Sequence, residues 1–130
     1  MAERALRKPP AELLSRYWLP VLVYLGTIQF LGSQPDLQVP MLFPNVDKVV
    51  HVFEYLGLGV FLARAIRASV RVPVPVRTAL IAVGVGVGMG ITDEFLQSFV
   101  PGRMSSMNDL IADLTGLLLA QFIFLLVVRD

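Results

Sequence analysis

Four apolar stretches, separated by short connections that contain proline, dominate the pattern of this chain. They cover about residues 17–32, 49–68, 78–99 and 110–128. None of them alternates apolar and polar residues with a period of two, so strands are disfavoured. Roughly 20 helical residues span the hydrocarbon core of a bilayer, a length that the last three stretches provide and the first only narrowly approaches. The pattern predicts an all-α integral membrane bundle of four transmembrane helices, forming a single domain over residues 1–130.

The composition places the chain in the same class. Hydrophobic residues make up 55% of it and charged residues 16%, and the mean hydropathy is +0.70. Soluble domains have roughly 45–50% apolar and about 25% charged residues, and disordered chains are less hydrophobic still. The formal net charge of +1 gives no reason to expect nucleic acid as a partner. Because there is no cysteine, a disulfide framework and thiolate metal ligands are excluded.

The basic residues are distributed unevenly between the two ends of the expected helices. Nine of the eleven precede the first stretch, flank the second connection or end the chain: Arg4, Arg7, Lys8, Arg16, Arg64, Arg67, Arg71, Arg77 and Arg129. Only Lys48 and Arg103 fall on the other side. By the positive-inside rule, we expect both termini of a multi-pass membrane protein to lie in the cytoplasm. The connections at residues 33–47 and 100–107 then face outward.

Four glycines lie two residues apart in the third stretch, at positions 84, 86, 88 and 90. The spacing places Gly86 with Gly90, or Gly84 with Gly88, on one helix face as a GxxxG pair. Glycine-rich nucleotide loops need a preceding strand, which this pattern does not offer. The glycines therefore predict close helix packing.

Acidic residues gather at the outward ends of the last three stretches. They are Asp47, Glu54, Asp93, Glu94, Asp109 and Asp113, and His51, the single histidine, belongs to the same set. Helical spacing puts Asp47, His51 and Glu54 or Tyr55 on one face, Asp93 and Gln97 on another, and Asp109 and Asp113 on a third. Each ionisable group at membrane depth costs about 2.5–3.5 kcal/mol on insertion scales, so several together need a shared reason. We expect a polar cavity that opens to the outside.

Asp93 and Glu94 are the strongest candidates for a catalytic or cation-binding pair. Paired carboxylates at an outer cavity provide a general base or hold a divalent cation. Alternatively, they anchor the third helix through hydrogen bonds to Arg103 or to the start of the fourth. His51 with Glu54 has the spacing of a metal-site fragment, and a histidine satisfied by one carboxylate inside the bundle is the alternative. Because no second histidine exists, a stable zinc site is not expected; we assign no metal ligands, and the sequence identifies no particular cofactor.

Arg103 follows a Pro-Gly turn and precedes the expected fourth helix. A guanidinium beside the free N–H groups of a helix N-terminus forms an anion site, suited to a lipid phosphate or carboxylate. Alternatively, Ser106 caps the helix in an acidic capping box with Asp109, and Arg103 pairs with Asp93 or Glu94. Both can hold together.

Two further roles have simpler alternatives. Ser105 or Ser106 could act as a nucleophile, but no histidine lies at a known distance from either. Asp47 could line the cavity or cap the second helix.

The segment DKVVHVFEYLG, residues 47–57, looks like the second-helix signature of the VanZ-like family. The segment DEFLQSFVPGRMSSMND, residues 93–109, resembles that family's most specific motif, DExxQ-x-F-x-PGR-xx-S-xx-D. The likeness runs from about residue 45 to residue 120. It implies a small multi-spanning protein of the bacterial cell envelope, in a family named after an accessory protein of teicoplanin (glycopeptide antibiotic) resistance. The chain departs from the family at Asp113, where Asn is common.

The leading hypothesis is a membrane protein that binds an amphiphile with an anionic head, a membrane lipid or a lipid-linked molecule, at the outer leaflet. The resemblance links it to lowered susceptibility to teicoplanin. The alternatives are a hydrolase or transferase acting on a lipid-linked cell-envelope substrate, a polar network that only fixes helix register within a membrane assembly, and a proton-coupled transporter. The expected catalytic residues are Asp93, Glu94 and His51. The expected binding residues are Arg103, Gln97, Ser105, Ser106, Asp109, Asp47, Glu54 and Tyr55.

Overall fold

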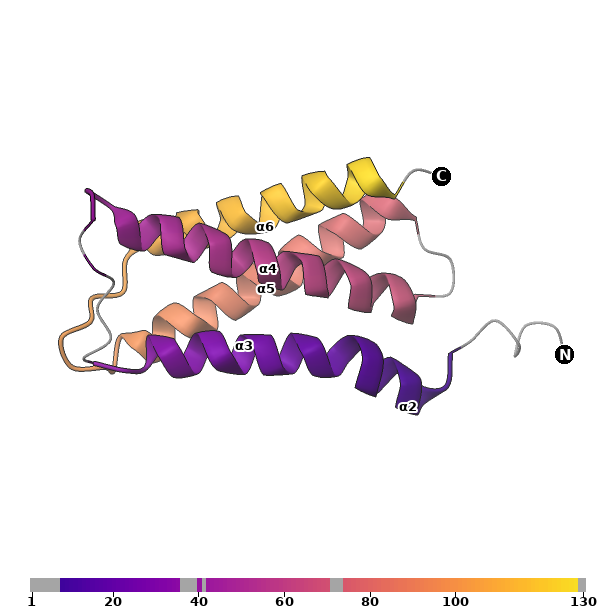
Figure 1. Ribbon diagram of the computed structural model, residues 1–130, viewed down its shortest axis with the longest axis horizontal. Coiled ribbons are helices and arrows are strands. Elements are labelled where there is room, and N and C mark those ends of the chain that lie inside the picture. Colours follow the sequence, from indigo (N-terminus) through magenta and orange to yellow (C-terminus); the bar gives the residue numbers. More distant parts are fainter. Residues whose placement is uncertain (1–7, 36–39, 41, 71–73, 129–130) are drawn as a thin grey trace, which may run out of the picture.

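The computed structural model describes residues 8–35, 40, 42–70 and 74–128, and the regular structure of these residues is entirely helical (Figure 1). In chain order the elements are α2 (Pro10–Leu13), η1 (Leu14–Trp18), α3 (Leu19–Gly32), α4 (Val46–Ser69), α5 (Pro75–Gln97) and α6 (Met107–Val127). The all-α prediction is confirmed. Three of these helices, α4, α5 and α6, are long and apolar enough to cross a membrane.

The N-terminal segment is a helical rod in which α2, η1 and α3 follow one another without a break (Figure 1). At η1 the rod makes one turn of π-helix, and the Leu19 N–H donates to the Leu14 carbonyl five residues back. Pro20 comes directly after this turn and has no N–H to donate, so the regular hydrogen-bond pattern is interrupted there. The rod begins at Pro10, earlier than the apolar pattern alone indicates, because polar residues near the N-terminus join the helix.

The three long helices also begin earlier than their apolar stretches, because their first turns are polar. Ser106 caps α6, and its hydroxyl accepts the Asp109 N–H at 3.2 Å. The residue before α4 is Asn45, in a left-handed conformation with φ 60°. Asp47 lies inside the first turn of α4, and no side chain caps that end. Capping of this helix by Asp47 is therefore wrong.

Helices α4 and α6 run parallel and approach each other most closely at Gly116. A Cβ atom at this position would overlap the carbonyl oxygen of Val52 and lie 2.8 Å from the Leu56 nitrogen. Further along the same contact, the Gln121 side-chain amide donates to the Gly59 carbonyl at 3.1 Å. Because the neighbouring atoms at Gly116 belong to backbone, only a residue without a side chain fits there.

The glycines of α5 divide into two pairs. A Cβ atom at Gly86 would overlap the side chain of Leu117, and one at Gly90 would lie 3.2 Å from Oδ2 of Asp113. Nothing lies within 4 Å of the corresponding positions at Gly84 and Gly88. The predicted packing role is therefore confirmed for Gly86 and Gly90, which face α6.

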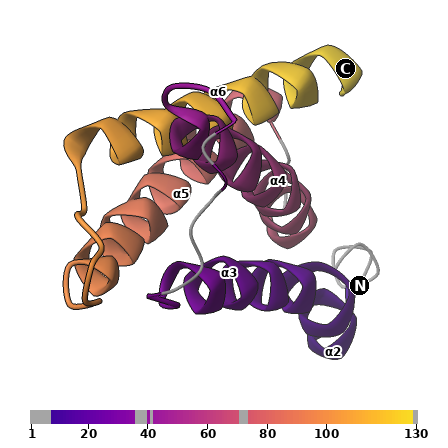
Figure 2. The same cartoon turned by 60° about the vertical axis from the view of Figure 1, so that its left-hand side comes forward.

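The apolar core lies around the fully buried side chains of Tyr55, Leu58, Leu62 and Leu117, and α3 adds Val21 and Ile28 to it. Helix α3 covers this core from the side opposite α6 (Figure 2). It contacts α4 and, to a smaller extent, α5, but among the described residues it makes no contact with α6. One wall of the bundle is thus attached more loosely than the other three.

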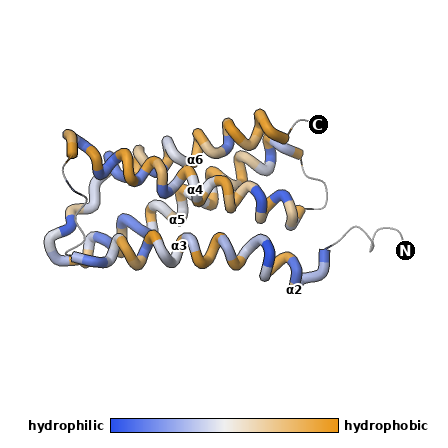
Figure 3. Tube along the Cα trace, in the orientation of Figure 1, coloured by the Kyte–Doolittle hydropathy of each residue, from blue (hydrophilic) through white to orange (hydrophobic). Residues whose placement is uncertain are grey.

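The outer faces of the helices carry large apolar side chains. Phe30, Phe53, Leu80 and Phe122 are each more than 60% exposed. Polar residues concentrate toward the ends of the helices, and the middle of the bundle is mostly apolar (Figure 3). A contiguous apolar surface of this kind is unfavourable in water and suits hydrocarbon.

The contact at Gly116 generates a matched pair of predictions. Gly116→Ala should lower the free energy of unfolding by about 1–3 kcal/mol, because the new methyl group meets backbone that no side-chain rotation can move. Gly84→Ala, in open space, should leave stability unchanged or slightly raised. Thermal unfolding in detergent micelles measures both, and equal stabilities would contradict this account of α4–α6 packing.

Candidate functional site

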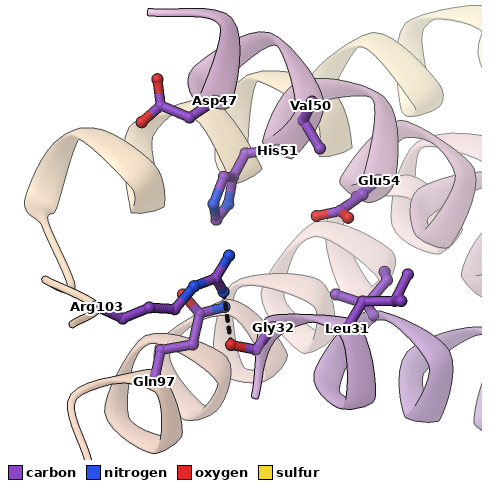
Figure 4. A pocket seen from close by; sticks show the side chains of 9 residues that line it. Leu31, Gly32, Asp47, Val50, His51, Glu54, Gln97 and Arg103 are labelled. Atoms are coloured by element: carbon purple, nitrogen blue, oxygen red, sulfur yellow. Dashed lines mark hydrogen bonds between the residues drawn. The ribbon is translucent and has the colours of Figure 1, made fainter. Parts of the chain in front are cut away.

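Polar side chains and one backbone carbonyl, contributed by four segments, meet at one end of the bundle. The segments are the last turn of α3, the first turns of α4 and α6, and the end of α5 with its connection to α6. Between them lies a cavity of about 220 Å³. Its lining consists of Ile28, Leu31, Gly32, Asp47, Val50, His51, Glu54, Gln97 and Arg103 (Figure 4). The cavity therefore has a charged part and an apolar part, the latter supplied by α3 and Val50.

Arg103 reaches the cavity from the α5–α6 connection. The preceding Gly102 has φ 80°, a left-handed conformation that glycine adopts without strain. The guanidinium donates to the Gly32 carbonyl at 2.6 Å, which satisfies an otherwise unpaired acceptor at the C-terminal end of α3. Figure 4 shows Arg103 and His51 pointing toward one another across the cavity. The predicted pairing of Arg103 with Asp93 or Glu94 is wrong, because the guanidinium bonds to the carbonyl instead.

His51 on α4 is held by Asp113 on α6. Its Nδ1 lies 2.8 Å from Oδ1 of Asp113, whose side chain is fully buried. The expected alternative of a histidine satisfied by one carboxylate is therefore confirmed, with Asp113 rather than Glu54 as its partner. A carboxylate on Nδ1 fixes the orientation of the ring and leaves Nε2 available for other chemistry.

Lys48 forms a second bridge between α4 and α6. Its ammonium lies 2.7 Å from Oδ2 of Asp47 and also pairs with Oδ1 of Asp109. The sequence pattern indicates only that Lys48 lies on the outward side, and it does not predict these two partners. Lys48 lies one helical turn before His51, and Asp109 lies one turn before Asp113. Two parallel helices with this matching spacing can form both pairs, so the spacing is the signal that could have predicted them.

Asp93 and Glu94 lie behind the cavity and do not line it. Both side chains are buried, and Oε2 of Glu94 accepts the Ser106 N–H at 3.1 Å. This bond confirms the anchoring of α5 to the start of α6. The remaining oxygen of Glu94, Oε1, is buried without a hydrogen-bond partner, as is Oδ2 of Asp93.

The serines differ in their surroundings. The predicted cap by Ser106 is confirmed, because its hydroxyl accepts the Asp109 N–H and also donates to Oδ2 of Asp109 at 2.8 Å. The reciprocal bond of a capping box is not formed, because the Ser106 N–H donates to Glu94 instead of Asp109. Ser105 is exposed and makes no side-chain hydrogen bond to the described residues. Neither serine is hydrogen-bonded to His51.

The structure thus sorts the predicted site residues into three groups. Asp47, His51, Glu54, Gln97 and Arg103 line the cavity. Asp93, Glu94, Ser106 and Asp109 lie outside its lining, among the packed helix ends, and Tyr55 lies in the apolar core. Ser105 is on the surface. The sequence reasoning missed the Gly32 carbonyl and the apolar wall of Ile28, Leu31 and Val50, because backbone acceptors and ordinary apolar residues carry no chemical signal.

One group of side chains has the composition of a metal site. His51, Glu94 and Asp109 each offer a ligand atom, and these atoms lie within 4.8 Å of one another. Glu54, the residue that sequence spacing grouped with His51, does not belong to this set.

Comparison with known proteins gives one match. The model of the family described as VanZ/LLP1 matches residues 6–128. No curated protein and no solved structure matches the chain.

The Glu94–Ser106 bond can be tested by comparing two variants. Glu94→Ala and Glu94→Gln both remove the buried carboxylate, but only glutamine retains an oxygen that accepts the Ser106 N–H. We expect Glu94→Ala to be less stable than Glu94→Gln by about 1–3 kcal/mol. Thermal unfolding in detergent measures the difference, and equal stabilities would show that the bond does not anchor α6.

Proposed function

The chain belongs to the VanZ/LLP1 family, and from that premise we propose that it binds the anionic head of an amphiphile at the outer surface of a bacterial cytoplasmic membrane. The observation that carries the proposal is the guanidinium of Arg103 in a cavity that is also lined by apolar side chains. A guanidinium forms strong, charge-assisted hydrogen bonds to phosphate and carboxylate groups.

The apolar wall supports an amphiphile over a small soluble anion. Ile28 and Leu31 from α3 and Val50 from α4 line the cavity beside the polar groups. An acyl chain lying against these residues would bury apolar surface while the head reaches Arg103 and Gln97. A membrane lipid or a lipid-linked molecule has this division into head and chain.

Topology is the second part of the proposal. Beside the three long helices, the rod from Pro10 to Gly32 is about 35 Å long at 1.5 Å per residue, enough for a fourth crossing. Lys8, Arg16, Arg64, Arg67 and Arg77 belong to the ends of elements away from the cavity. The positive-inside rule then places the cavity outside and both termini in the cytoplasm. Arg4, Arg7, Arg71 and Arg129, which support the same orientation, lie outside the described residues.

The family resemblance suggests the cellular consequence. Teicoplanin carries an acyl chain, and a protein that binds amphiphiles at the outer leaflet would act at the same boundary. Lowered susceptibility to teicoplanin is therefore the cellular readout that we propose for this chain.

A second candidate function is hydrolysis or group transfer on a lipid-linked cell-envelope substrate. The observation that favours it is the His51–Asp113 pair at the cavity wall, because an imidazole oriented by a carboxylate is suited to general-base catalysis. Among the residues first considered catalytic, His51 alone lines the cavity. Product formation in a lipid-binding assay, lost in His51→Gln, distinguishes an enzyme from a binding protein.

The orientation can be tested directly because the chain has no native cysteine. Met104, 90% exposed in the α5–α6 connection, and Val76, 57% exposed at the start of α5, lie at opposite ends of the bundle. We expect a membrane-impermeant maleimide to label Met104→Cys in intact cells and Val76→Cys only after lysis. The reverse labelling would overturn the orientation, and labelling of both in intact cells would contradict the crossing of α5.

The anion site can be tested by native mass spectrometry of the purified protein with added anionic lipid. Arg103→Ala should bind the lipid at least about tenfold more weakly than wild type, because a charge-assisted bond contributes about 1.5–3 kcal/mol. Arg64→Ala, which removes the same charge at the other end of α4, should bind as wild type does.

Two results would contradict the binding role of Arg103. Equal lipid binding in wild type and Arg103→Ala would exclude Arg103 from the site. A loss of thermal stability in Arg103→Ala that matches the loss of binding would assign Arg103 to attachment of α3. Arg103→Lys, which keeps the charge, should retain part of the lipid affinity.

A further inference from the structure

His51, Glu94 and Asp109 come from three different helices and converge beside the cavity, which His51 lines and the other two do not. Each provides a ligand atom, and these atoms lie within 4.8 Å of one another. The chemistry of the set is one imidazole nitrogen and two carboxylates, all of which are ordinary metal ligands. Because α4, α5 and α6 each contribute one residue, the arrangement depends on the packed bundle and not on local spacing in the sequence.

Carboxyl groups at this end of the bundle outnumber the basic side chains beside them. The acidic side chains are Asp47, Glu54, Asp93, Glu94, Asp109 and Asp113, and the basic ones are Lys48 and Arg103. Lys48 pairs with Asp47 and Asp109, and Arg103 bonds to a carbonyl. Among the described residues, Asp93 and Glu94 form no salt bridge. A bound cation would supply the missing charge.

An independent observation points to a ligand at the same place. Oε1 of Glu94 has no hydrogen-bond partner, although the residue is only 9% exposed. Oδ2 of Asp93 and Oδ2 of Asp113 are likewise buried and unpartnered. Buried acceptors are nearly always satisfied in folded proteins, so three unpaired carboxylate oxygens in one region require an explanation.

We propose that His51, Glu94 and Asp109 bind one divalent cation. A mixed set of imidazole and carboxylate ligands suits a first-row transition ion such as Mn²⁺ or Zn²⁺ better than Ca²⁺ or Mg²⁺, which take oxygen ligands. Asp113 bonds to Nδ1 of His51, which leaves Nε2 to coordinate the ion. A carboxylate that holds the second nitrogen of a ligating histidine is a common support for metal sites.

Lys48 competes for the same site. Its ammonium pairs with Asp109, so cation binding requires Lys48 to release that carboxylate and to remain with Asp47 alone. The competition gives the proposal a distinctive consequence: removal of the ammonium should strengthen cation binding. The inference does not rest on amphiphile binding, because Glu94 and Asp109 lie outside the cavity lining and the test uses the metal alone.

The experiment uses the full chain, purified in detergent and freed of metal with a chelator, and Mn²⁺ as the probe. We expect one equivalent of Mn²⁺ to bind, observed as a loss of the free-ion electron paramagnetic resonance signal. The bound ion should show spin-echo modulation from a single imidazole nitrogen. Calorimetric titration with Zn²⁺ provides the second probe.

Four variants separate coordination from general attraction. Glu94→Gln and Asp109→Asn should each weaken Mn²⁺ binding at least about tenfold, while Glu54→Gln, which removes a nearby charge but no ligand, should change it less than about twofold. Lys48→Gln should tighten binding several-fold.

The proposal is overturned if neither Mn²⁺ nor Zn²⁺ binds wild type or Lys48→Gln at millimolar concentration. It is also overturned if Glu54→Gln weakens binding as much as Glu94→Gln does, or if the bound Mn²⁺ shows no nitrogen modulation. If a ligand variant does not fold, the test still depends on two measurements: Mn²⁺ binding by wild type and by Lys48→Gln, and the nitrogen modulation of the bound ion.

Discussion

The close approach of α4 and α6 at Gly116 determines the positions of the other groups at the polar end. Because the helices run parallel, successive turns of α4 contact successive turns of α6 in the same order. Lys48 pairs with Asp109 and His51 with Asp113, on one side of Gly116, and Gly59 accepts from Gln121 on the other. A side chain at Gly116 would separate the helices and weaken every one of these pairs.

The helices and the polar end could be predicted from the sequence, because apolar runs and the positions of charged residues report them directly. The partners within the polar end could not. Asp113 was one of several carboxylates within reach of His51, and only the register set at Gly116 selects it. Arg103 bonds to the Gly32 carbonyl, a backbone group that is present at every residue and therefore carries no signal. The cap by Ser106 was predictable because it involves only residues that are close in the sequence.

The loosely attached α3 distinguishes the two halves of the bundle. Helices α4, α5 and α6 pack closely at glycines and are joined by buried hydrogen bonds. Helix α3 contributes apolar side chains and the Gly32 carbonyl, which accepts a hydrogen bond from Arg103. The same contact therefore joins α3 to the cluster and presents the guanidinium to the cavity. A ligand that binds the Arg103 guanidinium would either compete with the Gly32 carbonyl for it or bind beside that carbonyl and help to hold α3 in place.

The direction of each helix also affects the electrostatics at the polar end of the bundle. Helices α4 and α6 begin there, so the positive ends of their dipoles face Asp47 and Asp109 in their first turns. Helix α3 ends there, and its negative end meets Arg103. Helix α5 also ends there, but its last turns carry Asp93 and Glu94, so its dipole adds to their negative charge. The C-terminal end of α5 is therefore the place in this bundle where the helix dipole favours bound carboxylates least and a cation most.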